Sequence, residues 1–320
     1  MVKIKEWLKK TPYKDYEITV ASADASFRQY YRLTQENETV LLMDSSLEKD
    51  SLAPFIDVTS RLLNAGIKAP QILEQNLEDG FLIIEDFGNT HLLNILNENN
   101  FQKLYSSAID EIIKMQNAST KDLPLYDKAF LHFEMDLMQD WYLERKLNIT
   151  LDEQQKELLK NSLNAISEVV LSQPQNVFVH RDYHSRNIML TQTDVIGVID
   201  YQDAMNGAIT YDLVSLLKDC YIEFEREEIE KLALEFRDKK GINASDEEFI
   251  KWFDFMGLQR HIKVLGVFSR LYLRDGKDGY LKDIPLTLKY TIETAFRYEE
   301  TKELAEFLKS AQLDSKASLE

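Results

Sequence analysis

The segment 180–187, with the sequence HRDYHSRN, concentrates side chains that can move protons and bind cations. Two short apolar runs, Val177–Val179 and Ile188–Leu190, flank it and favour strands on either side. The carboxylate of Asp182 can accept a proton from an attacking hydroxyl group. The amide oxygen of Asn187 is a hard ligand that suits Mg²⁺. The segment is therefore either a solvated polar turn or a loop that strands hold in place for chemistry, and we favour the loop.

A second carboxylate, Asp200, ends the β-favouring run 195–200, thirteen residues after Asn187. The short connection 191–194 predicts a hairpin that brings Asp200 back beside Asn187. An amide oxygen and a carboxylate placed together can hold Mg²⁺ against the phosphates of ATP. With Asp182 as the base, these residues predict phosphoryl transfer to a hydroxyl group.

Three other residues have expected roles around this loop. His184 stands two residues after Asp182, and we expect it to contact the transferring phosphoryl group during catalysis. His180 follows an apolar strand, so we interpret it as a structural histidine that bonds the backbone of the loop. Asp212 begins a helical pattern, which predicts an N-terminal cap that also braces the loop.

The composition limits the classes of partner. The chain has 320 residues and a formal charge of −17, so we do not expect a nucleic-acid surface. One cysteine, Cys220, excludes an intrachain disulfide and fits a reducing cytoplasm. No apolar run approaches the roughly 18 residues of a membrane helix. We expect a cytoplasmic protein that binds small molecules and has no obligate protein partner.

The periodicity of the apolar residues changes near residue 87. Strands are expected over 16–21, 29–34, 39–44, 71–74 and 81–84, with one helix over 51–65. Beyond residue 90, three- and four-residue spacing predicts helices over 101–116, 129–147, 151–172 and 210–312. The expected fold class is α+β, with a small strand-rich lobe over residues 1–87 and a larger helical lobe over residues 88–320.

With these residues in view, the chain resembles the aminoglycoside phosphotransferase-like branch of the protein-kinase-like superfamily. The spacing His-x-Asp-x-x-x-x-Asn at 180, 182 and 187 matches its catalytic loop, and a strand ending at Asp200 follows. A closer resemblance is to the bacterial anomeric kinases of N-acetylmuramate and N-acetylglucosamine. That resemblance rests on Asp24–Arg32, Phe81–Gly88, Asp200–Ala204, Thr210–Leu213 and Gln259–Gly266.

The resemblance implies a two-lobed protein-kinase-like fold that binds ATP and Mg²⁺ between its lobes. Ser22–Arg28 would take the place of the glycine-rich phosphate loop, although it contains no glycine. The backbone that follows the strand 81–84 would bind adenine. The residues implied to bind ATP are Ser26, Phe27, Arg28, Arg32, Glu85 and Phe87, and those implied to bind the metal are Asn187 and Asp200.

The chain departs from the superfamily on the third strand, which usually carries a lysine paired with a helix carboxylate. Met43 occupies that position here, and the strand contains no lysine. Arg28 or Arg32 would have to supply the cation, unless the phosphates depend more on Mg²⁺. We prefer Arg28 because it directly follows the proposed phosphate loop, and a surface charge is the alternative for both arginines.

Acceptor specificity is expected in the helical lobe. Lys263, Arg270 and Arg274 are spaced by seven and four residues, so they share one helix face. They could hold an anionic acceptor such as the lactyl carboxylate of N-acetylmuramate, and an ordinary solvated helix face is the alternative. The residues predicted to line the acceptor site are Gln202, Asp203, Arg260, His261 and Arg270.

The resemblance thus implies ATP-dependent phosphorylation of the anomeric hydroxyl of N-acetylmuramate or N-acetylglucosamine, in peptidoglycan recycling. Two alternatives stay open. One is another small-molecule kinase of the aminoglycoside or choline kinase type. The other is a nucleotide-binding pseudokinase, which the missing lysine suggests, although Asp182, Asn187 and Asp200 are all present.

Overall fold

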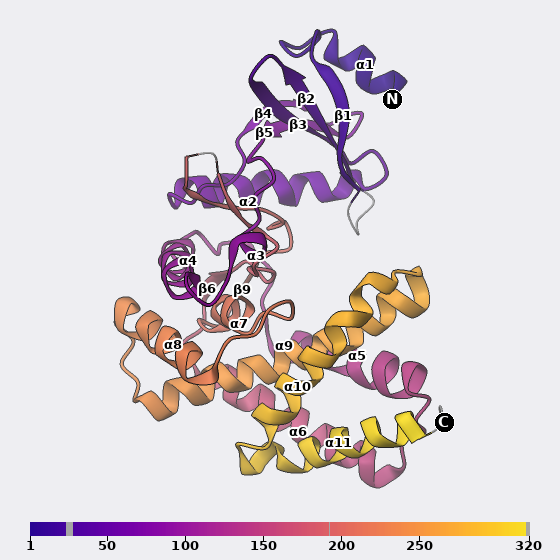
Figure 1. Ribbon diagram of the computed structural model, residues 1–320, viewed down its shortest axis with the longest axis vertical. Coiled ribbons are helices and arrows are strands. Elements are labelled where there is room, and N and C mark those ends of the chain that lie inside the picture. The colour runs from indigo at the N-terminus through magenta and orange to yellow at the C-terminus, as the bar shows by residue number, and fades with distance from the viewer. Residues whose placement is uncertain (24–27, 192, 318–320) are drawn as a thin grey trace. The chain divides into compact units, whose positions relative to one another are not determined.

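The computed structural model describes residues 1–23, 28–191 and 193–317. The chain divides into two compact units (Figure 1). The first contains residues 1–95 and 186–204, and the second contains residues 96–185 and 205–320. The chain crosses between them three times, and one of these crossings falls inside HRDYHSRN, between Ser185 and Arg186. A division of nucleotide-binding and acceptor-binding roles at residue 87 stays a prediction.

A five-stranded antiparallel sheet in the order β1-β2-β3-β5-β4 forms the core of the first unit. The strands are β1 (Glu17–Ala23), β2 (Gln29–Gln35), β3 (Glu38–Asp44), β4 (Ile72–Asn76) and β5 (Phe81–Glu85). Val40 and Leu42 alternate along β3, so both face the same side, where they pack with Ile4 and Leu8 of α1 (Val2–Leu8). The five strands predicted for this segment are confirmed.

The first unit also contains α2 (Leu52–Asn64), α3 (Leu92–Ile95) and a hairpin formed by β7 (Ile188–Leu190) and β8 (Ile196–Val198). Phe55, Val58 and Leu62 are buried along α2, as their helical spacing predicts. The hairpin predicted from the two apolar runs is confirmed, with Ile188 opposite Val198. Val198 donates its backbone N–H to the carbonyl of Lys68 across 2.9 Å, which ties the hairpin to the segment between α2 and β4.

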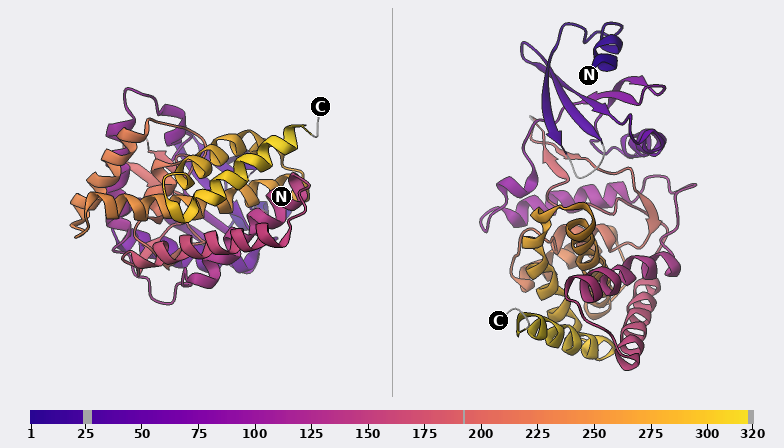
Figure 2. Two further views of the ribbon diagram at one scale, coloured as in Figure 1. Left: turned by 90° about the horizontal axis from the view of Figure 1, so that it is seen from below. Right: turned by 90° about the vertical axis from the view of Figure 1, so that its right-hand side faces the viewer.

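The described part of the second unit contains eight α-helices, of which the longest, α9, is central. They are α4 (Phe101–Met115), α5 (Lys128–Leu137), α6 (Glu153–Ser172), α7 (Tyr211–Leu217), α8 (Arg226–Lys240), α9 (Asp246–Asp275), α10 (Ile284–Ala295) and α11 (Lys302–Ala317). The central helix, α9, contacts α5, α6, α7, α8 and α10. Figure 2 shows α11, drawn in yellow, which contacts α10 and α6.

Gly266 allows α9 and the end of α5 to pack closely together. A β-carbon at Gly266 would lie 2.3 Å from the backbone carbonyl carbon of Leu137, so a larger residue would force the two segments apart. The helix is capped at both ends. The Ser245 side chain accepts from the backbone N–H of Glu248 across 3.1 Å, and Gly276 follows with φ +68°.

Two features of the second unit differ from the prediction. The single helix expected over 129–147 changes at Met138 into a π-helix that runs to Lys146. In addition, β6 (Val177–Val179) pairs with an unpredicted strand, β9 (Met205–Gly207). HRDYHSRN therefore lies, in the sequence, between two strands that pair with each other.

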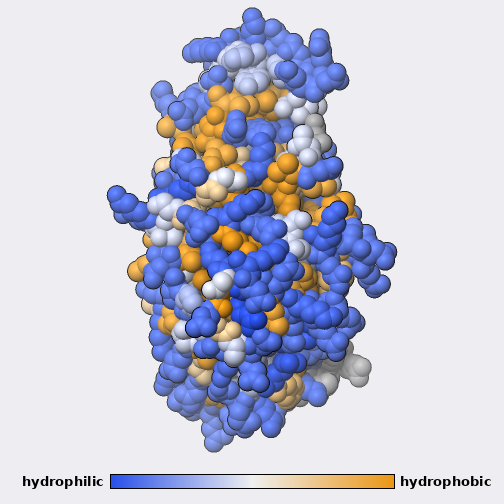
Figure 3. Space-filling view, turned by 90° about the vertical axis from the view of Figure 1, so that its left-hand side faces the viewer, coloured by the Kyte–Doolittle hydropathy of each residue, from blue (hydrophilic) through white to orange (hydrophobic). Residues whose placement is uncertain are grey.

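The surface agrees with the acidic composition. The face drawn in Figure 3 is largely hydrophilic, with apolar residues gathered in separate patches. None of the helices in the described part of the chain is long and apolar enough to cross a membrane.

Candidate active site

Asp212 holds the backbone of the predicted catalytic loop. Its carboxylate accepts the backbone N–H of His180 across 2.8 Å and that of Arg181 across 3.0 Å. The bracing role predicted for Asp212 is confirmed. The capping role is wrong, because Thr210 is the N-terminal cap of α7 and the Asp212 carboxylate is directed to the loop. Burial raises the pKa of Asp212 to about 7, although the two backbone donors favour its charged form.

His180 has the structural role predicted for it. The side chain is fully buried, and its Nδ1 accepts the backbone N–H of Asp182 across 3.2 Å. Arg181, between them, has φ +76°, a left-handed conformation that is uncommon for a residue other than glycine. The loop therefore adopts a strained backbone that surrounding side chains hold in place.

A buried polar cluster supports the side chain of Arg181. Glu134 of α5 forms an ion pair with Arg181 and accepts from Lys263 of α9 across 3.1 Å. The guanidinium of Arg181 also lies over the ring of Phe130, 5.4 Å from its centroid. Burial opposes ionisation of Glu134, but Lys263 and Arg181 outweigh that effect and keep its pKa below the ordinary value.

Asp182 is accessible, which a base must be. Its side chain is 41% exposed, and Oδ1 lies 3.7 Å from the guanidinium of Arg260. Burial of the group tends to raise the pKa of Asp182, but Lys263, Arg260 and other nearby cations lower it well below its usual range. Asp182 is therefore ionised at neutral pH and can accept a hydrogen bond from a hydroxyl group.

The end of the loop within the second unit is fixed by a residue that sequence reasoning missed. Asp219, just beyond α7, accepts both the backbone N–H of Ser185 across 2.9 Å and the hydroxyl of Ser185. The ring of His184 packs edge-on against Tyr221, with centroids 5.2 Å apart. Only its position after α7 could have singled out Asp219 in the sequence.

In the first unit, the hairpin brings the predicted metal ligands together. Asn187 donates its side-chain amide to Asp200 across 3.3 Å, and Gln202 donates to the other carboxylate oxygen across 3.0 Å. Asp200 has φ +64°, a conformation that aspartate tolerates better than most residues. His91 Nδ1 contacts the carbonyl of Arg186 at 2.7 Å, which holds the loop where it enters this unit.

The donor set fits Mg²⁺ bound together with phosphates. Asn187 and Asp200 offer an amide oxygen and a carboxylate, and Mg²⁺ commonly takes one or two such ligands plus phosphate oxygens. Over residues 1–23, 28–191 and 193–317, no group of three or more histidine, cysteine, aspartate or glutamate side chains could hold a metal alone. A site completed by a nucleotide is consistent with both facts.

The residues implied to bind ATP have varied surroundings. Ser26 and Phe27 lie outside the described residues. Arg28 is only 5% exposed; it donates to Ser51 across 3.3 Å and lies 5.9 Å from the ring centroid of Phe55. Phe55 stacks in turn on Tyr201, next to Asp200. Arg28 is therefore linked through Phe55 to Tyr201, the residue that follows the predicted metal ligand Asp200.

Arg32 is occupied by the segment that follows β5. It makes a bidentate ion pair with Asp86, with distances of 2.6 and 3.1 Å, and also donates to the carbonyl of Gly88 across 3.3 Å. Glu85 pairs with Lys68 at 2.5 Å. These contacts favour a structural role for Arg32 and Glu85, in which they fix the conformation of the segment after β5.

Phe87 and Met43 complete this part of the first unit. Phe87 is buried against β8, where a β-carbon at Gly197 would lie 2.6 Å from its ring. Met43 is buried within β3 at the position where the superfamily usually has a lysine. The strand therefore supplies no cation.

The residues predicted to line the acceptor site fall into different environments. In the first unit, Gln202 is bonded to Asp200 and lies beside Asp203. In the second, Arg260 and His261 are buried in α9. His261 Nε2 contacts the carbonyl of Lys218 at 2.9 Å and its ring stacks on Tyr290. Burial lowers the pKa of His261 to about 3, so it is neutral, and its contacts favour a structural role.

The cationic stripe expected on α9 is not uniform. Lys263 is buried and paired with Glu134, whereas Arg274 is exposed and pairs with its neighbour Asp275. Arg270 lies between these extremes and is partly buried. Its Nε is buried without a hydrogen-bond partner among the described residues. Of the three cations, Arg270 is thus the best suited to meet an anionic ligand.

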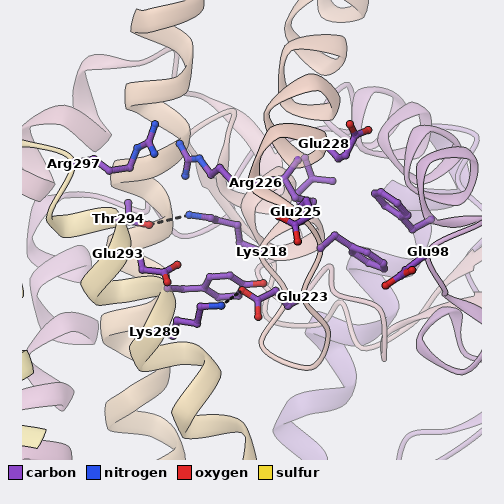
Figure 4. Close-up of a pocket in the computed structure, with 15 residues that line it drawn as sticks. Glu98, Lys218, Glu223, Glu225, Arg226, Glu228, Lys289, Glu293, Thr294 and Arg297 are labelled. Carbon is purple, nitrogen blue, oxygen red and sulfur yellow. Dashed lines mark hydrogen bonds and ion pairs between the residues drawn. The ribbon is translucent and has the colours of Figure 1, made fainter.

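A pocket of about 890 Å³ opens in the second unit between α8 and α10 (Figure 4). Its charged groups largely pair with each other or with deeper carboxylates. Lys289 binds Glu223 at 2.7 Å, and Lys218 donates to Thr294 across 2.9 Å. Sequence reasoning gave no role to these residues.

Comparisons with known proteins agree with this geometry. The model of the phosphotransferase enzyme family matches residues 17–248. The chain belongs to this family. N-acetylmuramate/N-acetylglucosamine kinases of Neisseria meningitidis and Pseudomonas aeruginosa are each 38% identical to it. The alignments cover 93% and 92% of this chain, and 92% and 88% of the respective relatives.

Solved structures show the same fold at low identity. The Plasmodium vivax ethanolamine kinase has a TM-score of 0.66 and 14% identity, over 91% of this chain and 86% of that one. The ADP-bound aminoglycoside phosphotransferase APH(2'')-Ib has a TM-score of 0.62 and 16% identity, over 91% and 97%. The predicted kinase-like α+β fold and the predicted family resemblance are both confirmed.

Family membership clarifies which parts of the site are unusual. The predicted base, the predicted metal ligands and the loop-bracing Asp212 follow the pattern expected of a phosphotransferase. The absence of a lysine from β3 is the main departure.

Proposed function

We propose that this protein transfers the terminal phosphoryl group of ATP to the anomeric hydroxyl of N-acetylmuramate or N-acetylglucosamine. The observation that carries the proposal is the 38% identity, over nearly the whole chain, to two kinases named for these amino sugars. The site supports it chemically, since it contains an ionised and accessible carboxylate and an oxygen ligand pair for Mg²⁺. The expected setting is recycling of cell-wall sugars.

Asp182 is the proposed base. Its carboxylate would accept a hydrogen bond from the acceptor hydroxyl, orient it for attack and take its proton as the bond to phosphorus forms. Asn187 and Asp200 would hold Mg²⁺, which neutralises charge on the phosphates when it is bound. Gln202 keeps the Asp200 carboxylate oriented by donating to one of its oxygens.

His184 would stabilise the transferring phosphoryl group, as its place two residues after Asp182 suggests. In the first unit, Arg28 would supply the cation that β3 lacks. Its proximity to Phe55 and, through it, to Tyr201 beside Asp200 supports this assignment over Arg32, which is bound to Asp86.

Arg270 is the proposed contact for the lactyl carboxylate of N-acetylmuramate. Its Nε is buried and has no hydrogen-bond partner in the described part of the chain, whereas Lys263 and Arg274 both pair with carboxylates. A carboxylate ligand would satisfy that donor with a charge-assisted hydrogen bond.

The direct test is transfer from radiolabelled ATP to each amino sugar, with an aminoglycoside and choline in the same panel. An acid-labile sugar phosphate marks an anomeric product. Asp182→Asn should reduce turnover by about 10² to 10⁴, since it removes a general base. Asp275→Asn, an exposed carboxylate paired with Arg274, is the matched control and should retain activity. Transfer only to choline or an aminoglycoside would replace the proposed acceptor, and tight Mg·ATP binding without any transfer would indicate a pseudokinase.

A further inference from the structure

Arg260 is a buried cation whose contacts are unlike those of a structural arginine. It is only 3% exposed, and its Nε has no hydrogen-bond partner among the described residues. Arg226, in the same unit, makes two 2.7 Å hydrogen bonds to the carboxylate of Asp254. Among the residues that the structure describes, Arg260 has no such bidentate carboxylate partner. Because a buried guanidinium without one is costly, stability alone does not account for its place in the core of α9.

The contact that Arg260 does make is to the backbone beside the base. It donates to the carbonyl of Arg181 across 2.9 Å, and that carbonyl belongs to the peptide bond between Arg181 and Asp182. The N–H of the same peptide donates to His180 Nδ1 across 3.2 Å. Both polar atoms of this peptide are therefore held by side chains, and its orientation decides the direction in which the Asp182 side chain leaves the backbone.

The hydrogen bond from Arg260 helps to hold a strained part of the loop. Arg181 has φ +76°, and Asp212 fixes its N–H from the other side. A non-glycine residue in this conformation persists only where its surroundings impose it. Without Arg260, the carbonyl of Arg181 would lose this hydrogen bond, and the peptide could relax toward a commoner conformation.

Arg260 also places a positive charge 3.7 Å from Asp182 Oδ1. Other charged groups face this carboxylate from each neighbouring element. They are Arg181 and His184 on its own loop, Lys263 on α9, and Asp212 on α7, with Glu134 of α5 paired to Arg181 and Lys263. Lys263 is neutralised in part by Glu134, whereas Arg260 has no carboxylate closer than Asp182 among the contacts described.

We propose that Arg260 is a positioning residue for Asp182: it fixes the peptide bond that carries the base and holds a positive charge beside its carboxylate. This inference rests on the proposed kinase function. It replaces the expectation that Arg260 contacts the acceptor sugar, because its donor group is directed to the catalytic loop.

The test compares Arg260→Met, Arg260→Lys and the control Arg226→Met by steady-state kinetics over a range of pH. Arg260→Met should lower kcat by about 10²-fold, the effect of a misplaced catalytic group. KM for the sugar and for ATP should change little. The acidic limb of kcat/KM should move to higher pH, because Asp182 loses a cation that favours its ionised form.

Arg260→Lys keeps the positive charge, so the acidic limb of its kcat/KM profile should stay near the wild-type position. Its kcat should still be reduced, because an ammonium group lacks the planar reach of a guanidinium. Arg226→Met should lower the melting temperature but leave kcat of the folded enzyme and its acidic limb unchanged. A rise in KM for the sugar with kcat intact in Arg260→Met would overturn the inference and restore an acceptor contact. A fall in kcat with an unmoved acidic limb would also contradict it.

A measurement without substrate separates this inference from the proposed function. The ¹³C carboxyl resonance of Asp182, assigned by its loss in Asp182→Asn, should titrate at a higher pH in Arg260→Met than in the wild type, because one of the cations that favour the ionised carboxylate is gone. In the wild type it should stay ionised to lower pH. If the wild type phosphorylates no amino sugar, the proposed function fails, and this titration still decides the role of Arg260.

Discussion

Asn187 and Asp200 lie thirteen residues apart in the sequence, yet their side chains meet at 3.3 Å. The hairpin of β7 and β8 produces this meeting, because its antiparallel register aligns Ile188 with Val198. Each of the two proposed ligands lies just outside the paired residues. Their contact is therefore a direct consequence of a short connection between two apolar runs.

The first prediction concerns this pair. Asp200→Asn should reduce kcat by at least about 10²-fold, since it removes the only carboxylate of the proposed Mg²⁺ site. The thermal stabilisation produced by Mg·ATP should fall in parallel. Asp203→Asn, which alters the second carboxylate that Gln202 Nε2 contacts, should have a much smaller effect on the Mg²⁺ dependence. An Asp200→Asn enzyme with an unchanged Mg²⁺ requirement would refute the metal assignment.

The second prediction concerns the cation that replaces the lysine of β3. Arg28→Met should raise KM for ATP and lower kcat by about tenfold or more, because a charge-assisted contact to phosphate is lost. Arg32→Met should act differently. It leaves the buried carboxylate of Asp86 without its partner, so it should lower the melting temperature more than it changes kcat. If Arg32→Met loses ATP binding and Arg28→Met does not, the two roles are reversed.

The elements of the first unit could be predicted because their signals are local. Alternation along β3 and β5, and the glycines after α2 and before β5, determine where strands and turns lie. The hairpin that brings Asn187 beside Asp200 was predictable for the same reason, since a short connection joins its two strands.

Long-range contacts account for what could not be predicted. The three residues of β9 carry no strand signal of their own, and the strand exists because β6 offers it a partner. The roles of Arg260 and His261 depend on what lies against α9. Helical spacing shows which residues share a face of α9. It does not show that Arg260 contacts a loop carbonyl or that His261 contacts the end of α7. Asp219 was missed because nothing in its own neighbourhood marks Ser185 as its partner.

The third prediction concerns recognition of the lactyl carboxylate. Arg270→Met should raise KM for N-acetylmuramate by about ten- to a hundredfold, since a hydrogen bond to a charged group contributes about 1.5–3 kcal/mol. KM for N-acetylglucosamine, which has no such carboxylate, should stay near its wild-type value. Arg274→Met is the matched control four residues along the same helix, and its pairing with Asp275 predicts no effect on either sugar. Equal losses for both sugars in Arg270→Met would exclude a specific contact with the carboxylate.

The fourth prediction concerns Asp212 and the pH dependence of stability. Burial raises its pKa in the folded protein to about 7, compared with an ordinary value of 3.8. The folded state therefore binds this proton more tightly than the unfolded state does. The stabilisation it provides is complete below about pH 4 and is lost as the pH rises toward 7, by about 1.4 kcal/mol for each unit of pKa difference.

Asp212→Asn should remove this contribution, so the free energy of unfolding of the variant should fall less than that of the wild type between pH 4 and 7. The same variant should lower kcat, because an asparagine can offer one acceptor oxygen where His180 and Arg181 each donate to a separate oxygen. Denaturant unfolding at several pH values measures the first effect, and steady-state kinetics the second. Parallel stability curves for the two proteins would show that Asp212 is already ionised at pH 4, held so by its backbone donors.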